Sequence, residues 1–153
     1  MFTLPSLLLS LAAAATAVQG ATFRMRQEMS FSNGTIHQPI ADEILVANTT
    51  FDFSYTQPNS CESGYSLFTV YFTAQEPAFS QLDTNGNFPD DEFLFSFGEF
   101  TLGTPPPPTL TTPDLGSEVQ SLFFAVVGDF QDCPPDVANE YGLVFVPVTF
   151  EST

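Results

Sequence analysis

Hydrophobic and polar positions alternate along several short stretches of the chain. Within residues 22–31 every second position is mostly apolar, and the same period of two recurs in residues 43–56 and 141–150. This alternation is typical of β-strands that bury one face. Residues 65–74 and 119–127 are apolar at nearly every position, which indicates central strands buried on both faces. Because no stretch has a convincing helical period, the pattern predicts an all-β domain.

A sixth strand is predicted at residues 92–102, where Phe93, Phe95 and Phe97 share one side. Clusters of Gly, Pro, Asn and Asp separate the six stretches, as turns do in sandwiches and barrels. One connection, Gln75–Asp91, is longer than a hairpin loop. Loops of that length in a compact domain are often functional.

An apolar stretch precedes the strand pattern. Residues 7–18 read LLLSLAAAATAV, which is too short for a transmembrane helix of about 20 apolar residues. Small residues follow, as in a secretory signal peptide. We expect cleavage after Ala17 or Gly20, and prefer Gly20 because a strand pattern begins just beyond it. Removal of residues 1–20 from the 153 leaves 133 residues, 21–153, as one extracellular domain.

The two cysteines, Cys61 and Cys133, refine the strand count. Outside the cell they are expected to form a disulfide. From position 61 to position 133 it closes a 72-residue loop, which stabilises a fold by about 4 kcal/mol. Six antiparallel strands would put the two cysteines at opposite ends of the domain, too far apart to bond. A seventh strand at Thr109–Thr112 brings them to the same end.

The predicted fold is therefore an antiparallel two-sheet sandwich of about seven strands, in immunoglobulin-like order. The buried tryptophan of antibody domains is missing, because the chain has no Trp. Of its 18 phenylalanines only Phe2 lies in the signal, and the others are the expected core. A hydrophobic content of 43% argues against disorder.

The charge is strongly unbalanced. Eighteen Asp and Glu face two arginines, Arg24 and Arg26, and no lysine, which gives a net charge of −16. Nucleic-acid binding depends on neutralising phosphates with Lys and Arg. The composition therefore excludes nucleic acid as a partner, and we expect neither attraction to anionic lipid nor insertion into a membrane.

No catalytic motif stands out. The single histidine, His37, lies in a polar segment and is expected to be a solvated loop residue rather than part of a Ser-His-Asp triad. One histidine and a disulfide leave no ligand set for a His and Cys zinc site. Carboxylates are numerous enough for glycoside hydrolysis by a pair of acids, but no pair is singled out. We expect no resident cofactor.

One acidic loop is a weak candidate for Ca²⁺, which prefers oxygen ligands. Its members are Asp83, Asn85, Asn87, Asp90, Asp91 and Glu92. An EF-hand aligned from Asp83 fails, because Phe88 stands where Gly is needed and Leu94 where Glu is needed. A solvated loop tip is the alternative.

Two sequons, Asn33-Gly34-Thr35 and Asn48-Thr49-Thr50, predict N-glycosylation at Asn33 and Asn48. Asn33 is placed in a turn. Asn48 falls within the predicted strand 43–56, so a glycan there requires that strand to begin near Thr50.

The signal is short, lysine is absent, the two cysteines lie in CESGYS and DCPP, and the chain is rich in Thr, Pro and Phe. In these features the chain resembles uncharacterised small secreted proteins of filamentous, mushroom-forming fungi. The resemblance implies extracellular life and assigns no functional residue.

Three functions remain open. We expect an extracellular binding module for carbohydrate, cell wall or protein; the alternatives are a structural or surface-associated protein and a carbohydrate-active hydrolase with paired carboxylates. A cleft with two carboxylates favours the hydrolase, whereas an exposed apolar patch favours a protein partner.

Overall fold

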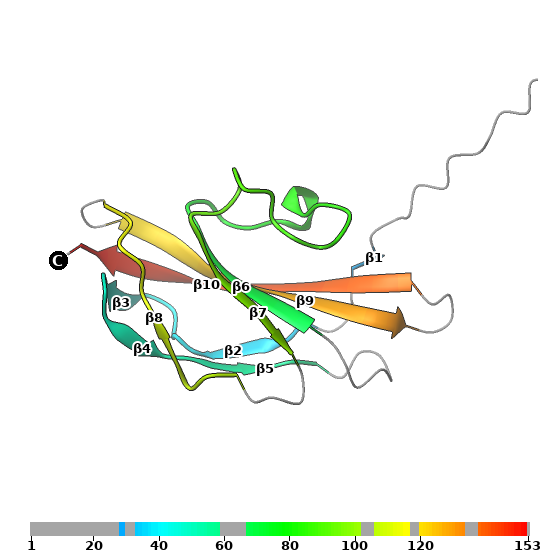
Figure 1. Ribbon diagram of the computed structural model, residues 1–153, viewed down its shortest axis with the longest axis horizontal. Helices are drawn as coiled ribbons and strands as arrows, with labels where there is room; N and C mark the ends of the chain where they lie inside the picture. Colours follow the sequence, from blue (N-terminus) through cyan, green and yellow to red (C-terminus); the bar gives the residue numbers. More distant parts are fainter. Residues whose placement is uncertain are drawn as a thin grey trace, which may run out of the picture.

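The computed structural model describes residues 28–29, 33–58, 67–101, 106–116, 120–133 and 138–152. These residues form strands and one short 3-10 helix, shown in Figure 1. The elements are β1 (Glu28–Met29), β2 (Thr35–Gln38), β3 (Glu43–Val46), β4 (Thr50–Asp52), β5 (Ser54–Thr56), β6 (Leu67–Thr73), η1 (Phe79–Gln81), β7 (Phe95–Thr101), β8 (Thr109–Thr111), β9 (Gln120–Cys133) and β10 (Ala138–Glu151). Among the described residues there is no helix that could span a lipid bilayer.

The largest sheet, called here the main sheet, has the order β1-β10-β9-β6-β7. Its centre is the antiparallel pair β9–β10, whose register runs from Gln120 opposite Phe150 to Cys133 opposite Ala138. The outer edge of β10 pairs parallel with β1 at one end and with β3 at the other. The main sheet is therefore mixed rather than purely antiparallel.

A second layer is built from two antiparallel pairs, β2–β5 and β4–β8. Only Phe53 separates β4 from β5, and its N–H donates to the carbonyl of Pro108 over 2.8 Å. Figure 1 shows these four strands on one side of the main sheet. We call the face of the main sheet toward them its inner face.

The core lies between the second layer and the inner face, and aromatic rings dominate it. Alternate residues of β6, β9 and β10 point inward and meet Phe51, Phe53 and Leu110 of the second layer. The ring of Phe124 is fully buried, with centroids 5.8 Å from Phe51 and 5.7 Å from Phe53. An aromatic pair at such a distance stabilises the fold by about 0.5–1.5 kcal/mol beyond the stabilisation that comes from burying the apolar area of the two rings.

The outer face of the main sheet is covered by the long connection between β6 and β7, residues 74–94, called here the excursion. A second apolar cluster joins Leu82 and Phe88 of the excursion to Tyr71, Val127 and Tyr141 of the sheet. Figure 1 shows the excursion on the side opposite β2, β4, β5 and β8. Strands β6 and β9 are apolar on both faces because both faces are covered.

The structure confirms an all-β chain and most of the expected strands. The strand inferred only from the geometry of a disulfide is present as β8, one residue shorter than expected. The predicted signal peptide, Cys61, both arginines and all of the predicted strand 22–31 except Glu28–Met29 lie outside the described residues.

The prediction of one continuous strand over residues 43–56 is wrong. A turn at Ala47–Asn48 separates β3 from β4, and Asn48 has a positive φ of 57°, which Asn tolerates better than most residues. Strand β3 therefore joins the main sheet, whereas β4, which does begin at Thr50, joins the second layer.

Strand β2 has no counterpart among the expected strands, because the polar segment around His37 was interpreted as a loop. The local sequence has no strand pattern, and the segment is a strand because it pairs with β5. The chain then crosses to the main sheet at Pro39, after a cis peptide bond.

Candidate functional site

Two tyrosines of the main sheet hold the excursion on the outer face. The Tyr71 hydroxyl donates to Oδ1 of Asn87 over 3.1 Å, and the Tyr141 hydroxyl donates to the carbonyl of Thr84 over 3.4 Å. The ring of Tyr71 also lies edge-on to Phe88, with centroids 5.2 Å apart. These contacts fix the middle of the excursion against β6 and β10.

The turn at residues 83–87 shapes that middle part. Oδ1 of Asp83 accepts the N–H groups of Asn85 and Asn87 over 2.8 and 3.0 Å, as Asx turns do. Gly86 has a φ of +76°, and a Cβ built there would overlap the ring of Tyr141. Only glycine satisfies both conditions, so Gly86 lets the turn lie flat on the tyrosine.

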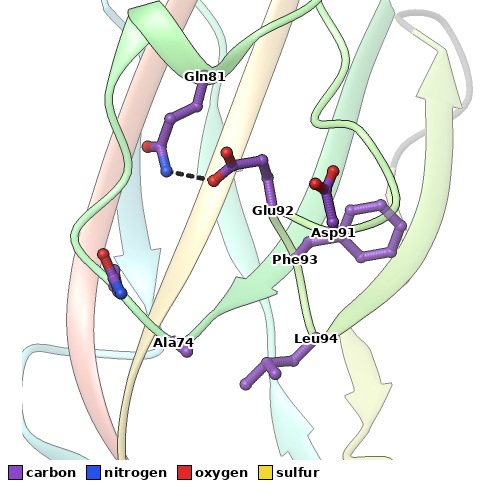
Figure 2. A pocket seen from close by; sticks show the side chains of 7 residues that line it. Ala74, Gln81, Asp91, Glu92, Phe93 and Leu94 are labelled. Atoms are coloured by element: carbon purple, nitrogen blue, oxygen red, sulfur yellow. Dashed lines mark hydrogen bonds between the residues drawn. The ribbon is translucent and has the colours of Figure 1, made fainter.

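A hollow of about 300 Å³ opens between the two arms of the excursion (Figure 2). The outgoing arm follows β6, and the returning arm leads into β7. The seven residues that line the hollow are Ala74, Gln75, Gln81, Asp91, Glu92, Phe93 and Leu94. Two amides, two carboxylates and two large apolar side chains therefore share one small concavity.

Gln81 connects the two arms. Its Oε1 accepts the N–H of Ala78 over 2.7 Å, and its Nε2 donates to Oε2 of Glu92 over 2.6 Å. Figure 2 shows Glu92 directed toward Gln81 across the hollow. Both ends of the Gln81 amide are bonded, so one wall of the hollow is held in a defined position.

The returning arm is fixed at its base by the main sheet. The N–H of Leu94 donates to the carbonyl of Phe72 in β6 over 2.7 Å. Within the arm itself, the N–H of Glu92 donates to the carbonyl of Pro89 over 2.9 Å. The ring of Phe93 packs 5.2 Å from that of Tyr71, whereas 43% of Leu94 is exposed. The hollow therefore sits on backbone that the sheet itself holds.

The six calcium candidates do not act together in the structure. Asp83 serves the turn, Asn87 accepts the hydroxyl of Tyr71, and Glu92 bonds with Gln81. Asp90 and Asp91 are exposed. Among the described residues no group of three or more His, Cys, Asp or Glu side chains is close enough to hold a metal ion. Calcium binding stays an untested prediction.

His37 is exposed, as expected, but it lies on strand β2 rather than in a loop. Its Nε2 is 2.9 Å from Oγ1 of Thr56 on the neighbouring strand. That contact is a cross-strand hydrogen bond.

The two sequon asparagines are both at the surface. Asn33 precedes β2, and its side chain lies beside Gly142 of β10. Asn48 lies in the turn between β3 and β4. Glycosylation at either position remains a prediction.

The cysteine pair stays a prediction as well, because Cys61 lies outside the described residues. Cys133 ends β9. The connection that contains Cys61 runs from Gln57 to Leu67, and Nε2 of Gln57 donates to the carbonyl of Leu67 over 3.4 Å. Leu67 pairs with Asp129, four positions before Cys133. Both ends of that connection therefore lie near the end of β9 that carries Cys133.

Burial raises the pKa of three tyrosines, Tyr55, Tyr71 and Tyr141, above its ordinary value, because the phenolate loses its hydration. Tyr71 and Tyr141 are the two that anchor the excursion. Both therefore keep their hydroxyl hydrogen, and with it the bonds to Asn87 and Thr84, over the neutral pH range.

Of the residues that line the hollow, sequence reasoning had singled out only Asp91 and Glu92, as calcium candidates. Gln75, Gln81, Phe93 and Leu94 were not assigned to a site. The available signal was the length of the Gln75–Asp91 connection. Comparison of the chain with family models, with curated proteins and with solved structures finds no match.

Proposed function

We propose that this chain is an extracellular binding module whose hollow, between the arms of the excursion, binds a carbohydrate. The observation that carries the proposal is the lining of the hollow. The side-chain amides can donate and accept hydrogen bonds and the carboxylates can accept them, and sugar hydroxyls can do both. The apolar surface of Phe93 and Leu94 suits the C–H face of a sugar ring.

Size and rigidity support the same ligand class. Small-molecule sites usually measure about 300–1,000 Å³, so a hollow of about 300 Å³ suits one or two sugar rings of a longer chain. Because Gln81 and Glu92 are already bonded to one another, little side-chain freedom is lost on binding. Preorganisation of this kind favours affinity.

The predicted glycans would leave the hollow open. Asn33 lies near the inner-face side of Gly142, and Asn48 lies in the turn where the chain passes into the second layer. The excursion covers the outer face, on the other side of the main sheet. A modified chain would therefore still present the hollow to an extracellular polysaccharide.

The fold proposed for this module is an immunoglobulin-like sandwich. The second layer faces the main sheet across the core, and the chain passes from β2, paired with β5, to β3, paired with β10. Sandwiches of this class are scaffolds for binding sites built on the connections between strands. The excursion is such a connection.

A hydrolase with paired carboxylates is the second candidate, because Asp91 and Glu92 both line the hollow. That mechanism needs two carboxyl groups on either side of the glycosidic bond. Figure 2 shows Glu92 turned toward Gln81 and Asp91 on the side of the Phe93 ring. The two carboxyl groups therefore do not face one another across a space where a glycosidic bond could lie. Binding is the better-supported function.

A structural or surface-associated role has one observation in its favour. Ile40, between β2 and β3, and Ile44, in β3, are 57% and 58% exposed. Single exposed apolar residues are normal on soluble proteins. The hollow, by contrast, combines several polar groups with apolar ones in one place.

The test is a screen of the secreted chain against an array of polysaccharides and oligosaccharides, with calorimetry on every ligand retained. The double variant Gln75→Ala, Asp91→Ala removes two polar groups from the hollow, and two lost hydrogen bonds cost about 1–3 kcal/mol. We expect a roughly 5- to 150-fold loss of affinity. The matched control, Asp52→Ala at an exposed position of β4, is expected to bind like the parent chain.

Two outcomes contradict the proposal. Retention of no saccharide refutes carbohydrate binding. Release of shorter oligosaccharides during the incubation, lost in the Asp91→Ala single variant, establishes the hydrolase instead.

A further inference from the structure

We infer that the carbohydrate bound by the hollow is cationic, an oligosaccharide of amino sugars whose ammonium groups pair with Asp91 and Glu92. The inference rests on the proposed function, because it names the class of sugar for the same site. It comes from the charges around the hollow together with its apolar lining.

The first step is the sign of the charge. The excursion carries the acids Glu76, Asp83, Asp90, Asp91 and Glu92 and no basic residue. Every charged side chain in the described part of the chain is acidic, because both arginines precede residue 28. No described cation therefore balances the two carboxylates of the hollow.

The second step is how the two carboxylates are bonded. Glu92 accepts one hydrogen bond from the neutral amide of Gln81. Asp91 is exposed and has no hydrogen bond or ion pair to the described residues. Both groups therefore have acceptor sites that water or a ligand must fill.

The third step compares ligands. A neutral sugar that covers these carboxylates removes their water and replaces it with hydroxyl hydrogen bonds alone, so the cost of burying the charge is only partly offset. An ammonium group supplies the opposite charge, and charge-assisted hydrogen bonds are roughly twice as strong as neutral ones. An anionic sugar is repelled. The expected order of affinity is amino sugar, then neutral sugar, then uronic acid.

The apolar part of the hollow restricts the cation further. A small amine or metal ion would meet only the carboxylates, whereas a sugar ring also covers Phe93 and the exposed Leu94. The acetyl group of an acetylated amino sugar abolishes the charge while leaving the ring unchanged. Acetylation is therefore the sharpest chemical change with which to test the inference.

The experiment uses the mature secreted chain and three probes of equal length and linkage: oligomers of glucosamine, of N-acetylglucosamine and of glucose. Calorimetry at mildly acidic pH, where sugar amines are protonated, measures each affinity at low and at physiological salt. We expect the glucosamine oligomer to bind at least about tenfold more tightly than the other two. Because exposed charges are screened beyond about 8 Å at physiological ionic strength, we expect salt to narrow that gap.

Two double variants separate the hollow from the overall charge. Asp91→Asn with Glu92→Gln removes the carboxylates while keeping an oxygen that can accept the Gln81 bond, and is expected to erase the preference for glucosamine. Asp52→Asn with Asp114→Asn makes the same change in charge at exposed positions outside the excursion. This control is expected to keep the affinity within about twofold. Circular dichroism checks the fold of each variant.

Each adverse outcome has one meaning. If all three probes bind equally, carbohydrate binding stands and the inference is overturned. If both double variants lose the preference equally, the attraction belongs to the acidic surface as a whole, which also overturns it. If no probe binds and the wider screen retains no saccharide, the proposed function fails together with the inference.

Discussion

Replacing Phe124 with alanine tests the two-layer core directly. The Phe124 ring is completely buried, and its centroid lies 5.8 Å from Phe51 and 5.7 Å from Phe53 of the second layer. On its own sheet it lies 5.9 Å from both Phe72 and Phe97. Truncation therefore opens a cavity where the second layer meets the main sheet.

The expected loss of stability follows from these contacts. A buried Phe→Ala change costs about 3–5 kcal/mol, and the lost aromatic pairs place Phe124 at the upper end of that range. The pair terms do not simply add, because the neighbours share one cavity. We expect about 4–5 kcal/mol, a large part of the roughly 5–15 kcal/mol of a whole domain. For a domain of this size that lowers the melting temperature by roughly 15 °C.

The assay is urea denaturation, in which a shift of the midpoint at constant slope reports stability alone. The control is Phe123→Ala, one position away but on the outer face. Phe123 is half-buried and its one described ring contact is with Phe145, 5.7 Å away, so we expect about 1–2 kcal/mol. Phe124→Leu is expected to cost about 1–2 kcal/mol, as Phe123→Ala does, because leucine fills most of the volume of the ring. It keeps the series measurable if Phe124→Ala does not fold.

Equal losses for Phe123→Ala and Phe124→Ala would refute the reasoning, because the two faces of β9 would then be equally packed. A larger loss at Phe123 would place the main core on the excursion side of the sheet.

Four other predictions follow from the structure. The three tyrosines whose pKa burial raises keep protons that the unfolded chain releases near pH 10. Stability should therefore hold below about pH 10 and fall above it, as followed by denaturant melts and tyrosinate absorbance. Gly86→Ala should lower the free energy of unfolding by about 2 kcal/mol or more and weaken saccharide binding, because the new Cβ meets the ring of Tyr141. In the control Gly116→Ala, φ is +64° and nothing lies within 4 Å of the new Cβ, so only backbone strain of about 1–2 kcal/mol is expected. Similar losses in both variants would show that the contact with Tyr141 does not matter. Reduction of the predicted Cys61–Cys133 bridge should lower the melting temperature by roughly 10 °C or more, and alkylation of both thiols without reductant would disprove the bridge. Peptide N-glycosidase should lower the mass of the chain produced in a eukaryotic host, and Asn33→Gln and Asn48→Gln should each remove one glycan; an unchanged mass on enzyme treatment contradicts both sites.

Much of the fold can be predicted from the sequence because strand patterns are local. The runs of apolar residues at 65–74 and 119–127 indicate strands covered on both faces, and β6 and β9 are covered by the second layer and by the excursion. Strand β8 is too short to stand out by pattern, and it was predicted only because a disulfide between the two cysteines would place both at the same end of the domain. The length of the Gln75–Asp91 connection marked the excursion as unusual.

Pairing between distant strands decided the rest. Strand β2 is polar and becomes a strand through β5, and the stretch 43–56 divides because its two halves join different layers. The hollow depends on the same long-range pairing. Its outgoing arm follows β6, and its returning arm is placed by the bond from Leu94 to Phe72. Gln81 and Glu92 are eleven positions apart, and no local pattern marks residues that meet only because two strands pair.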